Sequence, residues 1–136
     1  LYPHEPLNRI WDELEEESRI TSTLMLNEIL NKGNTIIEYR KNMMKDYCES
    51  KGFEAMLDNY KCFAINMASV SSDDFVIDNA DDYDILVGFS FDGEKWTYSL
   101  RSTKVDCSEC AMKFGGGGHK GAAGFSSPDF VMKKIV

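Results

Sequence analysis

The hydrophobic pattern of this chain changes abruptly at Lys51-Gly52. Before this point apolar residues recur at helical spacing, as in Ile10, Trp11 and Leu14, and acidic residues fill the positions between them. After it, short apolar or alternating runs typical of β-strands occupy residues 53–57, 60–68, 85–91 and 95–100. The pattern predicts an α/β fold in which a mixed sheet of about five strands is flanked by helices and preceded by two or three linker helices.

The predicted linker helices occupy residues 1–50. Ser22 and Thr23 are capping candidates for a second helix that ends at Gly33, because glycine is favoured just past a helix terminus. A third helix is expected to begin after Asn34 and to continue to about Ser50. We therefore predict a helical connector, residues 1–50, and a second domain, residues 51–136.

Turn and capping residues organise the second domain. The Asp92-Gly93 dipeptide predicts a tight hairpin between residues 85–91 and 95–100, and Asp58-Asn59 predicts one between the first two strands. The acidic segment Ser71–Asp84 is interpreted as a loop that could contain a short helix around Asp74–Asn79. Residues 105–114 predict a helix capped by Asp106 or Ser108, and residues 121–125 predict a last, closely packed strand.

Charge is distributed unevenly along the chain. The net charge is −8 over 136 residues, which argues against a protein that coats long nucleic acid, yet residues 101–136 carry +3. One small anionic ligand held locally fits this distribution better than an extended duplex. No apolar run is long enough for a membrane-spanning helix, and four scattered cysteines favour a reducing, cytoplasmic setting. Because the first residue is Leu1, we expect a fragment of a longer protein.

The segment Gly115–Lys120 is the main candidate for a functional site: it consists of four glycines followed by His119 and Lys120. Consecutive glycines are favoured where the backbone needs positive φ or must approach a ligand closely. The successive backbone N–H groups of such a loop can form a concave anion-binding site. Upstream, Arg101 stands among the hydroxyl residues Ser99 and Ser102, a combination suited to bidentate phosphate recognition. The residues alone leave other interpretations open: a flexible glycine loop, and a surface salt bridge for Arg101.

Two motifs resemble a known family. Gly116-Gly117-Gly118-His119 followed by Ala122-Ala123-Gly124 is similar to the Gly-Gly-Gly-His-x-x-Ala-Ala-Gly signature of the C-terminal DHH-associated domain of the DHH phosphoesterase superfamily. Ser99-Leu100-Arg101-Ser102 resembles the arginine motif of the same domain at a matching distance. The resemblance covers about residues 53–126, and residues 1–50 resemble, more loosely, the connector from the family's N-terminal DHH domain.

The resemblance implies a substrate-binding domain of a manganese-dependent phosphoesterase related to RecJ exonucleases, oligoribonucleases and exopolyphosphatases. The manganese belongs to the missing DHH domain, so no cofactor is expected in this chain, which should be inactive alone. Partners would be the protein's own DHH domain and a short single-stranded oligonucleotide or nucleotide phosphate. Oligoribonucleotide, cyclic dinucleotide, phosphoadenosine phosphate and polyphosphate all stay open as substrates. The alternative is an RNA- or nucleotide-binding module without a hydrolase partner, as in alanyl-tRNA synthetase-associated domains.

The resemblance also assigns roles by position. Arg101 would grip a phosphate, and backbone amides at Gly116, Gly117 and Gly118 would approach it. His119 would bond a phosphate oxygen near the scissile bond, while Ala122, Ala123 and Gly124 would keep the wall small. Asn66 and Lys120 are weaker candidates. A competing zinc site would combine Cys107, Cys110 and His119 with Cys48 or Cys62, although one Cys-x-x-Cys pair is a weak signal.

Overall fold

The computed structural model describes the backbone of residues 4–136 and the side chains from residue 8 onward, so residues 1–3 of the predicted connector lie outside the described residues. The chain divides into two compact units that meet between Arg40 and Lys41, within helix α1 (His4–Lys51). In the described part of the chain no helix is both long and apolar enough to cross a membrane.

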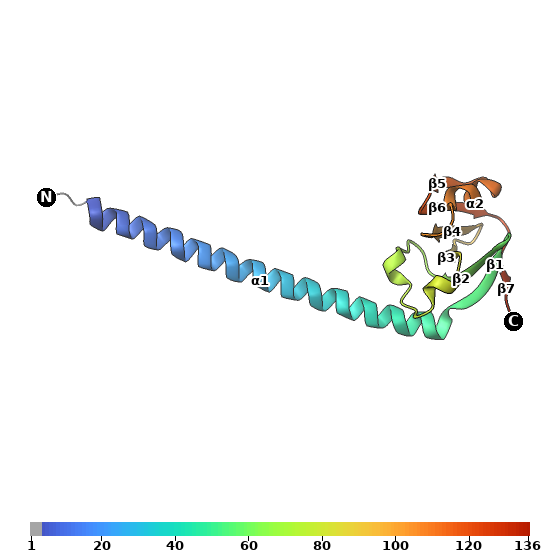
Figure 1. Cartoon of the computed structure of the whole chain (residues 1–136), viewed down its shortest axis with the longest axis horizontal. Coiled ribbons are helices and arrows are strands. Elements are labelled where there is room, and N and C mark those ends of the chain that lie inside the picture. Colours follow the sequence, from blue (N-terminus) through green and yellow to red (C-terminus); the bar gives the residue numbers. More distant parts are fainter. Residues whose placement is uncertain (1–3) are drawn as a thin grey trace. The chain divides into compact units, whose positions relative to one another are not determined.

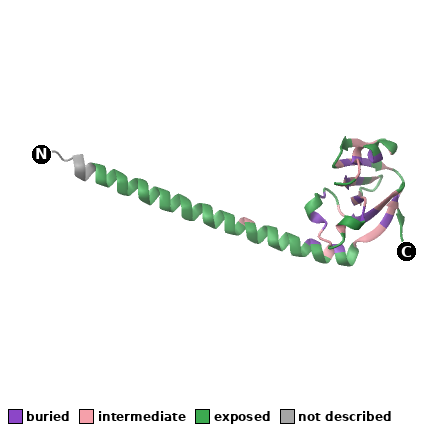
Figure 2. Ribbon diagram, in the orientation of Figure 1, coloured by how far each residue is buried: buried purple, intermediate pink, exposed green. Residues whose placement is uncertain are grey.

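The first unit is one uninterrupted helix, so the prediction of two or three linker helices is wrong (Figure 1). Gly33 does not end a helix: a single interior glycine costs only about 1 kcal/mol relative to alanine, and no proline follows within residues 8–51 to break the hydrogen-bond ladder. Large apolar side chains along this unit are exposed, among them Trp11 at 64% and Ile36 at 67% (Figure 2).

The second unit is built on a seven-stranded sheet in the order β5-β6-β4-β3-β2-β1-β7. Its strands are β1 (Phe53–Leu57), β2 (Tyr60–Asn66), β3 (Ile85–Phe91), β4 (Trp96–Arg101), β5 (Gly117–His119), β6 (Ala122–Ser127) and β7 (Lys133–Lys134). Only β2 and β3 pair parallel, so the sheet is mixed, as predicted. The expected five strands become seven because β5 and β7, of three and two residues, are too short to show a periodicity.

Each face of the sheet has its own hydrophobic core. On one face, helix α2 (Cys107–Lys113) packs beside β5 and β6 and contributes Cys107, Cys110 and Ala111 to a core that includes Tyr98 and Leu100 (Figure 1). On the other face, Met44 and Cys48 of α1 join Phe63, Ile65 and residues of the segment 70–83. Strand β2 is therefore buried on both faces, which explains its continuous apolar run.

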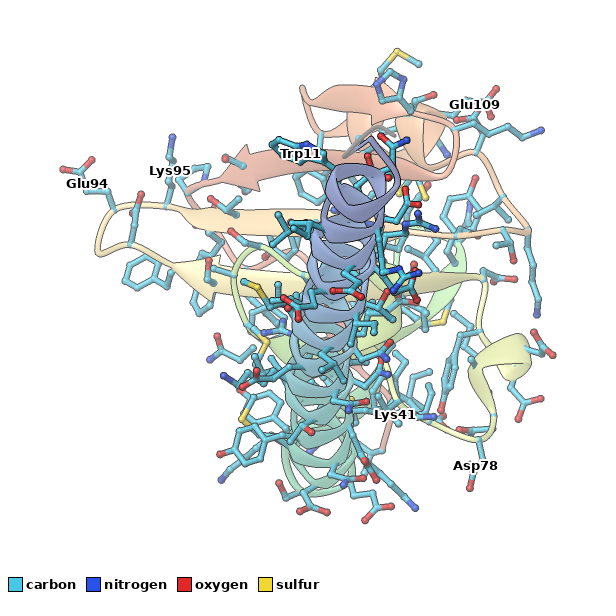
Figure 3. All side chains as sticks on the ribbon, turned by 90° about the vertical axis from the view of Figure 1, so that its left-hand side faces the viewer. Trp11, Lys41, Asp78, Glu94, Lys95 and Glu109 are labelled. Atoms are coloured by element: carbon cyan, nitrogen blue, oxygen red, sulfur yellow. The ribbon has the colours of Figure 1, made fainter. Side chains whose placement is uncertain are left out.

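Local turn chemistry behaves as predicted. Asp92 Oδ1 accepts hydrogen bonds from the backbone N–H groups of Glu94 and Lys95, both at 2.9 Å, and closes the β3–β4 hairpin from which these two residues project (Figure 3). Asp106 caps α2, its Oδ1 accepting from the Ser108 N–H at 2.9 Å. The segment 71–84 contains two 3₁₀ turns, η1 (Ser72–Asp74) and η2 (Ala80–Asp82), which lie before and after most of the short helix expected around residues 74–79.

The continuous helix makes Gly33 a test position. A Cβ built there meets nothing within 4 Å, so Gly33→Ala should raise helix stability by about 1 kcal/mol, measured as helicity and melting by far-UV circular dichroism. The matched control is Gly93→Ala, which also has open space but lies at φ +101° and should lower stability. Loss of helicity in Gly33→Ala would mean that the helix does break there.

Candidate phosphate-binding face

Strand register brings the two sequence motifs onto one face of the sheet. Arg101 of β4 lies directly opposite Ala122 of β6, and Ala122 lies directly opposite His119 of β5. Directly opposed residues of antiparallel strands present their side chains on the same face. Arg101, Ala122 and His119 therefore form one cross-strand row, in which Arg101 and His119 stand two strand spacings, roughly 10 Å, apart.

The next two rows contain only glycine and small hydroxyl residues. Ser99, Gly124 and Gly117 form the second row, and Thr97 and Ser126 form the third, with their hydroxyl oxygens 3.4 Å apart. We call the surface formed by these three rows the open face. None of its residues is buried, because α2 covers the opposite face and the segment 70–83 covers β2 and β3 instead.

Arg101 is held in place without its charge being neutralised. Its guanidinium donates from Nη1 to the Leu100 carbonyl at 2.8 Å and from Nη2 to the Val70 carbonyl at 2.9 Å. No carboxylate among the residues with described side chains forms an ion pair with it, which removes the salt-bridge interpretation. A guanidinium has five N–H donors, so three remain for a ligand.

A cavity of about 550 Å³ opens beside Arg101. One side consists of Arg101 and Ala122, together with Gly121 and the turn 102–104. The Ser102 hydroxyl fixes this turn, since it donates to the Asp84 carbonyl at 2.6 Å and accepts from the Lys104 N–H at 3.0 Å. The other side comes from the segment 71–86 and includes Ser71, Ser72, Ala80, Asp81, Tyr83, Asp84 and Leu86.

Sequence reasoning missed this second wall. Residues 71–84 form part of the connection between β2 and β3, and they look only acidic and loop-like in the sequence. The signal that could have found them is the parallel pairing of β2 and β3, because a parallel connection must cross a sheet face. That pairing is not visible in the sequence pattern.

The glycine run is ordered by backbone hydrogen bonds, so it is not a flexible loop: Gly117 and Gly118 belong to β5, and the N–H groups of Gly115 and Gly116 donate to carbonyls of α2. Glycine is required at two of its positions by packing: a Cβ at Gly118 would lie 2.6 Å from the Ala123 Cα, and one at Gly116 would collide with the Gly124 carbonyl. Gly118 also has φ +144°, which side chains rarely adopt. At Gly117, in contrast, a Cβ meets nothing within 4 Å and φ is not positive. Packing within this chain does not explain the glycine at that position.

Three predicted residues lie away from the Arg101 row. Ala123 is buried in the core on the opposite face, so it is not part of the wall expected from the resemblance. Asn66, at the end of β2, does not line the cavity, and its carbonyl accepts from the Tyr47 hydroxyl at 2.6 Å. Lys120 is exposed in the β5–β6 turn, where its carbonyl accepts from the Cys107 N–H at 2.8 Å. Ala123 faces away because adjacent residues of a strand point to opposite faces, whereas Lys120 lies outside the strands.

The cysteines do not form a zinc site with His119. All four are free and buried, whereas His119 is exposed on β5. Burial raises the pKa of the Cys107 thiol to about 11 and that of Cys62 to about 12, so both stay protonated at neutral pH. Among the residues with described side chains, no group of three or more His, Cys, Asp or Glu could hold a metal ion.

Comparison with known proteins agrees with the motifs. The model of the DHHA1 domain family matches residues 65–135, just over half of the chain. The chain belongs to the DHHA1 family, the DHH-associated C-terminal domain. The matched region includes the whole open face and both walls of the cavity.

Two solved structures are similar to this DHHA1 chain. One is an uncharacterized protein from Helicobacter pylori G27, with 21% identity and a TM-score of 0.48 over 70% of this chain and 27% of that one. The other is the pGpG-specific phosphodiesterase PggH from Vibrio cholerae, with 14% identity and a TM-score of 0.49 over 69% of this chain and 35% of that one. The chain thus spans about a third or less of the length of either protein. No curated protein sequence matches it.

The glycine geometry predicts a graded series of variants. Gly118→Ala and Gly116→Ala should each cost about 1–3 kcal/mol, because the added Cβ must displace backbone of β6. Gly117→Ala is the matched control, because it lies between the two positions and its Cβ would meet nothing within 4 Å; it should leave the melting temperature nearly unchanged. For a domain of this size each kcal/mol corresponds to a shift of about 4–8 °C in thermal denaturation. Equal melting temperatures for all three variants would contradict the packing argument.

Proposed function

We propose that this chain is the substrate-binding domain of a DHH-family phosphoesterase that hydrolyses short oligonucleotides or small nucleotide phosphodiesters. The observation that carries the proposal is the Arg101–Ala122–His119 row on the open face. This row supports a phosphate bound between Arg101 and His119, because the residue between them, Ala122, has only a methyl side chain and leaves room for the ligand.

Arg101 is suited to the main contact. Its planar guanidinium binds two oxygens of a phosphate at once, which a lysine ammonium cannot do. The bonds to the Leu100 and Val70 carbonyls orient it before the ligand arrives, so little side-chain entropy is lost on binding. Its half-buried position strengthens the attraction relative to a fully solvated charge.

His119 and Gly117 complete the proposed contact. His119 would hydrogen-bond a phosphate oxygen from the far end of the row and would stabilise charge that develops on the scissile phosphate. Gly117, directly opposite Gly124 in the second row, would let the ligand approach the backbone without meeting a side chain. Gly116, Gly118 and Gly124 would serve mainly by holding β5 against its neighbours.

The parent protein would supply the chemistry. We expect a DHH domain preceding the helix α1 to bind manganese and to cleave the ester that this chain presents. The overall acidic charge fits short substrates, since only the residues 101–136 are net basic. An RNA- or nucleotide-binding module without a hydrolase partner is the alternative, and manganese-dependent turnover by the full-length protein separates the two.

Arg101→Lys tests the bidentate contact. In the 136-residue chain this change should weaken binding of a 5′-phosphorylated dinucleotide at least tenfold, measured by isothermal titration calorimetry, because charge is preserved but the two-oxygen geometry is lost. Arg19→Lys is the matched control, since Arg19 is an exposed helix residue paired with Glu15 and Glu16. Unchanged affinity for Arg101→Lys would refute the proposed role.

Gly117→Val tests the backbone approach. Valine is favoured in strands and its Cβ would meet nothing within 4 Å, so the melting temperature should change little while dinucleotide binding is lost. Retained binding in this folded variant would exclude contact between the ligand and β5 at this position.

His119→Ala separates binding from catalysis in the full-length protein. Affinity should fall only partly, whereas turnover with manganese should fall further if the imidazole acts on the transition state. An equal loss in affinity and turnover would leave His119 a binding residue only.

A further inference from the structure

The turn that follows β2, residues 67–70, packs directly on strand β3. The Met67 N–H donates to the Ile65 carbonyl at 3.0 Å, and Ser69 takes the left-handed backbone conformation, with φ +55°. Val70 then lies over β3 with only 2% of its surface exposed, in the same core cluster as Ile65. The path of the turn and the burial of its last side chain together fix the position of Val70.

Gly88 of β3 provides the surface on which Val70 packs. A Cβ built on Gly88 would lie 2.4 Å and 2.8 Å from the two Cγ atoms of Val70, and 2.9 Å from the Met67 carbonyl oxygen. The φ angle of Gly88 is not positive, so backbone conformation does not require glycine at this position. The close approach of the turn 67–70 is what excludes a side chain there.

Val70 also bonds to Arg101 through its backbone. Its carbonyl accepts from Arg101 Nη2 at 2.9 Å, while its side chain is buried against Gly88. Gly88 lies directly opposite Ser99, two residues before Arg101 on β4, and therefore lies on the face that carries the guanidinium. The backbone of Val70 thus joins a packed core to the side chain that is proposed to bind phosphate.

We propose that Gly88 and Val70 are positioning residues for Arg101. The missing side chain at Gly88 lets Val70 pack close to β3, where its carbonyl reaches Nη2 and holds the guanidinium for a phosphate. A methyl group at position 88 would push Val70 away from β3, and a hydrogen bond weakens steeply when its distance and angle change. Neither residue lines the cavity beside Arg101, so both act through the orientation of its guanidinium. The inference rests on the proposed function and adds the residues on which its main contact depends.

Gly88→Ala tests the inference in the 136-residue chain. This change should weaken binding of a 5′-phosphorylated dinucleotide about three- to tenfold by isothermal titration calorimetry, because a guanidinium that rotates freely loses more side-chain entropy on binding. The titrations are run well below the melting temperature of each variant, so loss of folded protein does not contribute.

Gly52→Ala is the matched control. A Cβ at Gly52 would lie 2.2 Å from the Phe63 Cζ and 2.5 Å from the Cys48 carbonyl oxygen. Phe63 and Cys48 belong to the same core cluster as Val70, but Gly52 has no listed contact with the turn 67–70. Gly52→Ala should therefore lower the melting temperature and leave the dinucleotide affinity unchanged.

Val70→Ala tests the same contact from the other side, and it also serves if Gly88→Ala does not fold. Loss of the two Cγ atoms removes the packing of the turn on Gly88, so affinity should fall about three- to fivefold. In the double variant Gly88→Ala/Val70→Ala the new methyl group occupies space that the lost atoms leave. Its affinity should return to within about twofold of wild type, which two independent effects would not produce.

Nuclear magnetic resonance reports the orientation of Arg101 without any ligand. In wild type the bond to Val70 should slow rotation and solvent exchange of the guanidinium, which gives separate ¹H–¹⁵N signals for its Nη groups. Arg101→Lys removes these signals and thereby assigns them. Gly88→Ala should abolish them, whereas Gly52→Ala should retain them.

The outcomes separate this inference from the proposed function. Wild-type affinity and unchanged guanidinium signals in Gly88→Ala would overturn the positioning role alone, since Arg101→Lys tests the phosphate contact itself. An equal loss of affinity in Gly52→Ala would also overturn it, because any disturbance of this core would then be enough. If wild type binds no dinucleotide, the proposed function falls, and the guanidinium signals alone decide whether Gly88 orients Arg101.

Discussion

The pairing of β6 with both β4 and β5 is the constraint on which the candidate site depends. It sets Ala122 opposite Arg101 on one side and opposite His119 on the other. A slip of β6 by one residue would turn Ala122 toward the face that α2 covers and set Ala123 between Arg101 and His119 instead. Gly118 and Gly116 protect this register, because a larger residue at either position would push β5 away from β6. These two glycines of the motif thus act on the packing of β5 against β6.

Uneven coverage of the sheet creates the cavity. The face that α2 leaves free is covered over β2 and β3 by the end of α1 and the segment 70–83, and this covering stops before β4. Arg101 stands at that boundary, where its guanidinium bonds to the Val70 carbonyl of the covering segment. The core over β2 and β3 and the open face therefore meet at Arg101. This position explains why the guanidinium is half-buried although it forms no ion pair with a described side chain.

Much of the fold could be predicted from local signals. Strands β1 and β3 have the predicted bounds, the Asp92-Gly93 turn joins the expected hairpin, and Asp106 caps α2. Each of these signals involves residues close together in the chain. Two kinds of prediction were wrong. A helix end was predicted at Gly33, where the weak preference of glycine for helix ends does not interrupt the continuous helix α1. Strands β5 and β7 were not predicted because they are too short to show an alternating pattern.

The sequence by itself determined the family, the arginine, glycine and histidine motifs, and the residue types suited to a phosphate. Tertiary structure alone decided which of these residues lie together. It placed Arg101 and His119 on one face and Ala123 on the other, and it brought residues of the segment 71–86 to the same cavity as Arg101. The physical reason is that turns and caps depend on neighbouring residues, whereas strand register and the path of a parallel connection depend on pairing between residues far apart in the chain.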